Sequence, residues 1–189
     1  MHLLVIADSD FPLLAELRRV VGSEVDVTIG SDAVALRDAA RDAEVILLAP
    51  RQGSLLVELW RELRGVRWIH TLAAGVESLP FDLLRRSEVV VTNSRGLYAD
   101  ALGEFAIAAM LWFARDLRRL VRNQAARRWE PYTVERIDGK SVGIIGYGGI
   151  GQAVGRRASA LGMRVTGVRR RQEFGEPAVD DVLRDADYI

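Results

Sequence analysis

One stretch decides the fold of the C-terminal part of this chain: Ser141-Val142-Gly143-Ile144-Ile145-Gly146-Tyr147-Gly148-Gly149-Ile150-Gly151. An apolar strand leads directly into the pattern Gly-x-Gly-x-x-Gly, and an amphipathic helix follows. Gly146 is expected to make the tight turn, Gly148 to let a phosphate approach the backbone, and Gly151 to let the helix pack closely on the strand. The stretch therefore predicts a turn that binds the diphosphate of a dinucleotide.

The residues after the turn support this interpretation. Helical spacing continues at Ile150, Ala153, Val154, Ala158 and Leu161. Arg156 and Arg157 are expected to face away from this apolar stripe. Gly162 ends the helix before a second strand, Arg164–Val168, so a βαβ unit is predicted. The free N–H groups and partial positive charge at the helix start suit an anion. The cofactor-binding candidates in this turn are Gly146, Gly148, Gly149, Ile150 and Gly151. A tight glycine turn without a ligand is the alternative.

The residue after the second strand indicates which nicotinamide cofactor is bound. An acidic residue about 20 positions beyond the first glycine bonds the ribose hydroxyls of NAD. Arg169 occupies that place here, 23 residues after Gly146, and Arg170 follows it. A guanidinium group can bind a 2′-phosphate through two parallel hydrogen bonds. The pattern therefore favours NADP, with NAD as the alternative if these arginines belong to a solvated loop.

Composition excludes several classes of protein. The chain has 189 residues, of which 49% are hydrophobic, with 26 basic and 26 acidic side chains and no cysteine. Balanced charge does not favour a nucleic-acid partner, and the lack of cysteine excludes a disulfide framework or a thiolate metal site. No segment reaches the roughly 20 apolar residues of a membrane span. We therefore expect a cytoplasmic globular protein with no membrane, nucleic-acid or metal partner.

The N-terminal half alternates between short apolar runs and helical patterns. The predicted strands are Leu3–Ala7, Glu24–Ile29, Glu44–Ala49, Val66–Leu72 and Val89–Thr92. The predicted helices are Phe11–Val21, Ser31–Ala40, Leu55–Leu63 and Phe81–Arg86. Such alternation is typical of a parallel sheet with helices on both faces. The sequence thus predicts an α/β protein whose first part is flavodoxin-like.

A longer helical pattern begins after Gly96 and continues, with interruptions, as far as Arg128. Pro131 is expected to end it, because proline cannot continue the hydrogen-bond ladder. Three parts are therefore expected. They are a flavodoxin-like substrate domain over 1–97, a connecting helix and arm over 98–137, and a Rossmann dinucleotide-binding domain over 138–189 that is incomplete at its C-terminal end.

Four motifs resemble the D-isomer-specific 2-hydroxyacid dehydrogenases, the family of phosphoglycerate dehydrogenase and glyoxylate/hydroxypyruvate reductase. They are the stretches 68–77 (Trp-Ile-His-Thr-Leu-Ala-Ala-Gly-Val-Glu), 91–96 (Val-Thr-Asn-Ser-Arg-Gly), 101–104 (Ala-Leu-Gly-Glu) and 138–151, which contains the glycine turn. The resemblance implies hydride transfer between NAD(P)H and a small 2-keto or 2-hydroxy acid. A dimer is also expected, because family members commonly pair through the dinucleotide domain and the segment before it, where Trp129 and Tyr132 lie.

The resemblance also assigns residues. It implies that the backbone N–H groups around Ala74 and Gly75 bind the substrate carboxylate, a plain strand-to-helix turn being the alternative. Leu102 and Glu104 resemble the helix start beside the nicotinamide ring, although Gly103 replaces the usual alanine. A plain surface charge is the alternative for Glu104. His2 and His70 do not match the family's acid, so no catalytic residue is expected in this chain.

The family's catalytic arginine, acidic residue and histidine come later in its order than Ile189. Residues 185–189 also read as the opening of a third Rossmann strand. The expectation is therefore an N-terminal portion of a longer dehydrogenase, or an inactive truncated product. A cofactor-sensing binding protein, similar to the corepressors that share this architecture, is the remaining alternative.

Overall fold

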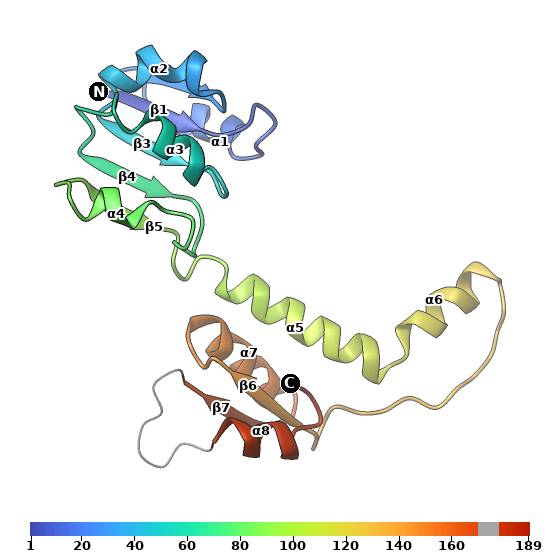
Figure 1. Cartoon of the computed structure of the whole chain (residues 1–189). Coiled ribbons are helices and arrows are strands. Elements are labelled where there is room, and N and C mark those ends of the chain that lie inside the picture. The colour runs from blue at the N-terminus through green and yellow to red at the C-terminus, as the bar shows by residue number, and fades with distance from the viewer. Residues whose placement is uncertain (170–177) are drawn as a thin grey trace. The chain divides into compact units, whose positions relative to one another are not determined.

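The computed structural model describes residues 1–169 and 178–189, and it divides into two compact units, Met1–Arg95 and Gly96–Ile189 (Figure 1). Each unit is described by itself. No helix in the described ranges has the length and apolar character needed to cross a membrane.

The first unit is a five-stranded parallel sheet. Its strands are β1 (His2–Ile6), β2 (Asp26–Gly30), β3 (Val45–Leu48), β4 (Trp68–Thr71) and β5 (Val90–Asn93). Its helices are α1 (Leu14–Val20), α2 (Ala33–Asp42), α3 (Gly53–Leu59) and α4 (Phe81–Leu84). The strand order is β2-β1-β3-β4-β5, and every neighbouring pair is parallel. This is the flavodoxin-like order, so the predicted fold class of this unit is confirmed.

The central strands of the first unit are apolar because both faces of the sheet are covered. Leu4 and Ile6 of β1 pack with side chains of α2 and α3 in one core cluster. Leu3 and Val5 of the same strand pack with Leu14 of α1 in another. Alternate residues of one strand thus enter two cores, which explains the continuous hydrophobic runs in the sequence.

The second unit opens with two helices, α5 (Ala99–Ala114) and α6 (Leu117–Ala125). The break between them lies at Asp116, which has a left-handed backbone with φ 45° and whose carboxylate accepts a hydrogen bond from the Arg119 N–H. The predicted interruption is therefore present. The expected terminator is wrong, however, because α6 ends at Ala125 and the positive φ of Arg127 turns the chain before Pro131 is reached.

The remainder of the second unit is the predicted βαβ unit. It comprises β6 (Ser141–Ile145), α7 (Gly149–Ala160), β7 (Arg164–Val168) and α8 (Val179–Asp185). Strands β6 and β7 are parallel, with Ser141 opposite Arg164 and Ile145 opposite Val168. An isolated parallel bridge joins Val142 to Tyr188 on the other side of β6. Tyr188 thus stands where the third strand of a Rossmann unit begins, as the sequence predicts.

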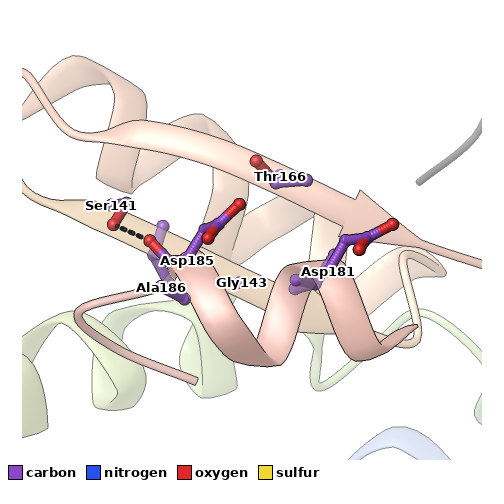
Figure 2. Close-up of a pocket in the computed structure, with 8 residues that line it drawn as sticks. Ser141, Gly143, Thr166, Asp181, Asp185 and Ala186 are labelled. Carbon is purple, nitrogen blue, oxygen red and sulfur yellow. Dashed lines mark hydrogen bonds between the residues drawn. The ribbon is translucent and has the colours of Figure 1, made fainter. Parts of the chain in front are cut away.

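Asp187 holds the segment around Tyr188 to β6. Its carboxylate accepts hydrogen bonds from the Ser141 N–H and hydroxyl, each at 2.8 Å, and Lys140 lies 3.6 Å away. The Ser141 backbone N–H, followed by its hydroxyl, lowers the pKa of Asp187 below the ordinary value for an aspartate. Figure 2 shows Ser141 and α8 around a small cavity, where the Ser141 hydroxyl oxygen lies 2.9 Å from the Asp185 carbonyl, a second acceptor for its proton.

Candidate functional site

The glycine turn has the geometry that its sequence predicts. Gly146 has φ +101°, a left-handed conformation that glycine adopts without steric cost. The N–H groups of Gly146 and Tyr147 both donate to the Val168 carbonyl, at 2.8 and 2.9 Å. The turn is therefore bonded directly to the end of β7.

The start of α7 leaves open space beside its backbone. Gly148 is the N-cap residue and Gly149 the first residue of this 12-residue helix. A Cβ atom at either position would meet no other atom within 4 Å. The first N–H groups of a helix have no acceptor within it, and they carry the positive end of its dipole. A diphosphate group fits this arrangement, because the space that side chains would occupy is empty and hydrogen-bond donors border it.

Gly151 has a different task from Gly148 and Gly149. It is buried, and a Cβ atom there would lie 3.0 Å from Cγ2 of Ile144 and closer still to the Gly146 carbonyl oxygen. The missing side chain lets α7 approach β6 and the turn. Ile150 lies in the first turn of α7 and is 46% exposed.

Arg169 directly follows Val168, the residue to which the glycine turn is bonded, and its side chain is exposed. Arg169 thus follows the end of β7, the strand to which the glycine turn is bonded. Arg170 was predicted to act with it, but it lies outside the described residues.

The candidate substrate loop of the first unit leaves the end of β4 and is anchored by the end of β5. The Asn93 side-chain amide donates to the Ala74 carbonyl at 2.7 Å, and the Ser94 N–H donates to the Ala73 carbonyl at 3.2 Å. Both candidates, Ala74 and Gly75, lie in this anchored loop. Sequence reasoning missed the anchoring role of Asn93, although the motif 91–96 contains it.

Comparison with known proteins fits this geometry. Residues 107–189 match the family profile described as the NAD binding domain of the D-isomer specific 2-hydroxyacid dehydrogenases. The chain is related to this family. It is 31% identical over 165 residues to a glyoxylate reductase of Thermococcus kodakarensis, covering 78% of this chain and 49% of that protein. It is 32% identical over 118 residues to a hydroxypyruvate reductase of Blautia hydrogenotrophica, covering 57% of this chain and 36% of the relative.

Solved structures of similar fold include a 2-hydroxyacid dehydrogenase family protein from Aeromonas salmonicida, with a TM-score of 0.79 and 23% identity over 98% of this chain. A dehydrogenase from Rhizobium meliloti has a TM-score of 0.76 and 26% sequence identity over 97% of this chain. The chain spans 61% and 67% of these two proteins. It therefore matches only part of the length of the 2-hydroxyacid dehydrogenases to which it is related.

Leu102, which was predicted to lie beside the nicotinamide ring, is in the first turn of α5 and is 43% exposed. Helix α5 runs beside α7 (Figure 1). Gly103 allows the close approach, because a Cβ atom there would lie 3.1 Å from the Ala153 Cβ. The departure from the dehydrogenases' usual alanine thus coincides with tight helix packing.

Arg157 corrects one sequence prediction. It was expected, with Arg156, to face away from the apolar stripe of this helix, yet its guanidinium group lies 3.1 Å from Asp100 and 3.4 Å from Glu104 on α5. Its side chain is only 27% exposed, whereas that of Arg156 is 64% exposed as predicted. The spacing rule failed because α7 contacts α5 as well as the sheet. Glu104 is consequently part of an ion-pair cluster that joins the two helices.

The two histidines contact hydroxyl groups in the sheet of the first unit. The His2 ring lies 2.9 Å from the Thr28 hydroxyl, and the His70 ring contacts the hydroxyls of Thr92 and Ser94 at 2.8 and 3.3 Å. Both join neighbouring strands of the sheet. In the described ranges, no group of three His, Cys, Asp or Glu side chains is arranged to hold a metal ion.

Proposed function

We propose that this chain binds NADP at the start of α7 and a small 2-keto or 2-hydroxy acid at the loop around Ala74 and Gly75, as part of a D-2-hydroxyacid dehydrogenase. One observation carries the proposal. Helix α7 starts with open space beside the backbone of Gly148 and Gly149, and the turn before it is hydrogen-bonded to Val168, which directly precedes Arg169. This site lies in a region that matches an NAD-binding domain.

The choice of NADP over NAD rests on charge. A phosphomonoester carries close to two negative charges and three acceptor oxygens. An arginine therefore binds the 2′-phosphate of NADP more strongly than it binds the ribose hydroxyls of NAD. Arg169 occupies the position at which an acidic residue would bond the ribose hydroxyls of NAD. An arginine there attracts a 2′-phosphate and offers no acceptor to those hydroxyls.

The loop around Ala74 and Gly75 would bind the substrate's carboxylate through backbone N–H groups. The Asn93 amide fixes this loop by donating a hydrogen bond to the Ala74 carbonyl. The bound cofactor would supply the hydride. The reaction also needs a proton donor and a cation beside the carboxylate, and we assign neither role to a residue in 1–189.

Leu102 would exclude water from the nicotinamide ring. Its partly exposed side chain lies on a helix that Gly103 and Arg157 hold against α7. A fixed apolar wall protects hydride transfer from solvent.

Calorimetric titration of the full 189-residue chain with NADPH and NADH tests the cofactor proposal. We expect NADPH to bind more tightly, and Arg169→Asp to weaken NADPH by at least about tenfold while NADH changes little. Arg118→Asp makes the same charge change at an exposed position on α6 and should alter neither affinity. Equal losses for both cofactors in Arg169→Asp would refute the phosphate-binding role, and no heat from either would refute the site.

Two further experiments test the substrate assignment. Titration of the chain with glyoxylate should shift the backbone amide NMR signals of Ala74 and Gly75. NADPH oxidation with glyoxylate or hydroxypyruvate should be absent for residues 1–189, because we assign the proton-donor role to none of them. Turnover by this chain alone would show that the catalytic assignment is wrong.

We also propose that the protein forms a homodimer through α6 and the segment after it. Trp129 is 94% exposed beside a groove that includes Leu120 and Tyr132. Large exposed apolar side chains are typical of interfaces. Light scattering should give twice the chain mass, and Trp129→Ser should lower it. A monomer at high micromolar concentration would contradict the proposal.

A cytoplasmic location remains a prediction of the sequence.

A further inference from the structure

The ring of Tyr147 occupies a space that two glycines leave open. A Cβ atom on Gly155 of α7 would lie 2.6 Å from the Tyr147 hydroxyl oxygen. A Cβ atom on Gly167 of β7 would lie 2.9 Å from Cε2 of the same ring and closer still to Cγ and Cδ2. The aromatic residue of the glycine turn is thus inserted between the helix and the second strand.

Backbone conformation does not require either glycine. Neither Gly155 nor Gly167 has a positive φ, so each backbone conformation is open to other residues. Glycine inside a helix is less favourable than alanine by about 1 kcal/mol, and glycine inside a strand also weakens it. The structure therefore accepts two unfavourable positions, and the feature they share is contact with the Tyr147 ring.

The same region contains the hydrogen bonds that join the turn to β7. The N–H groups of Gly146 and Tyr147 both donate to the Val168 carbonyl. Gly167 precedes Val168, and Arg169 follows it. The Tyr147 ring and these two hydrogen bonds consequently connect three parts: the turn before α7, the body of α7 and the end of β7.

We propose that Tyr147 is a positioning residue that sets the separation between the amides at the start of α7 and Arg169 at the end of β7. This inference rests on the proposed function, because those two groups would bind the diphosphate and the 2′-phosphate of NADP. Both phosphate groups are attached to the same ribose, which limits the distance between them, so the binding groups must match that span. Without the ring, β7 and α7 can move closer together, and the span no longer fits.

The test compares Tyr147→Ala with Tyr147→Phe by measuring Kd for NADPH and for NADH, together with the melting temperature. Tyr147→Ala should weaken NADPH by about tenfold or more and reduce the NADPH-over-NADH preference several-fold. Tyr147→Phe keeps the ring between the two glycines and should retain that preference. A residue with only a structural role would weaken both cofactors equally and leave the ratio unchanged.

Gly167→Ala tests the same separation from the opposite side. Its methyl group would push the ring and β7 apart, so it should also reduce the ratio, although Tyr147 is still present. This variant decides the question if Tyr147→Ala fails to fold. An unchanged NADPH-to-NADH ratio in a folded Tyr147→Ala or Gly167→Ala overturns the inference while the proposed function stands. Failure of the unsubstituted chain to bind either cofactor overturns the proposed function and the inference with it.

Discussion

Nη1 of Arg157 lies 3.1 Å from Oδ1 of Asp100, so an ion pair joins the third turn of α7 to the first turn of α5. Arg157 also reaches Glu104, one turn further along α5. These ion pairs hold the start of α5 against α7, and the close packing of Gly103 on Ala153 adds to this contact.

Replacement of Arg157 by alanine should lower the free energy of unfolding modestly. Exposed ion pairs contribute about 0.2–1 kcal/mol each, and the half-buried stem of Arg157 adds packing. Urea denaturation measures the change. Arg156→Ala is the matched control, because its exposed guanidinium lies 3.6 Å from the same carboxylate. Equal effects of the two substitutions would show that the contacts of Arg157 have no special weight.

Two alanine substitutions in the glycine turn should separate binding from folding. Gly151→Ala should destabilise the protein by about 1–3 kcal/mol, because its methyl group would press on Ile144 and the Gly146 carbonyl. Gly148→Ala should change stability by less than about 1 kcal/mol, because that site is open, yet it should weaken NADPH at least about tenfold. Calorimetry with thermal melting measures both. Unchanged NADPH affinity in Gly148→Ala would remove the backbone phosphate site.

Asp187 should make stability depend on acid pH. Its pKa is lowered in the folded protein, chiefly by the Ser141 N–H, so the charged form is favoured by folding. The stabilisation is fully present above the unfolded pKa of about 3.9 and is lost as the pH falls through the lower folded pKa. Asp187→Asn should therefore melt lower than the unsubstituted chain at pH 7.

The difference in melting temperature between these two proteins should shrink between about pH 4 and pH 2. Melting curves across this range give the comparison. Asp38→Asn is the control, because it removes an exposed charge from α2 of the other unit. A constant difference at every pH would mean that the Asp187 charge contributes nothing.

Asn93→Ala should loosen the loop around Ala74. Removal of the 2.7 Å hydrogen bond to the Ala74 carbonyl is expected to cost about 1 kcal/mol. It should also speed amide hydrogen exchange in residues 73–76, because their anchor is lost. Thr92→Val is the neighbouring control: its hydroxyl contacts Trp68 and His70 instead of the loop. Protection that persists in Asn93→Ala would show that another contact holds the loop.

The order of elements as far as β7 could be predicted from sequence because it depends on local patterns, whereas α8 was not predicted. Alternating apolar runs marked the five strands of the first sheet, and Gly146 marked the turn before α7. Local patterns were less informative about where helices end. Pro131 was the evident helix breaker, but the left-handed backbone at Arg127 already turns the chain.

The sequence alone determined most of the strands and helices and the open backbone at the start of α7, since periodicity and glycine spacing express local geometry. Only the tertiary structure decided that Arg157 faces α5, that Asn93 anchors Ala74 and that Tyr147 lies between Gly155 and Gly167. These contacts join residues distant in the chain. They depend on how closely helices and strands approach one another, and that distance is set by packing across the whole unit.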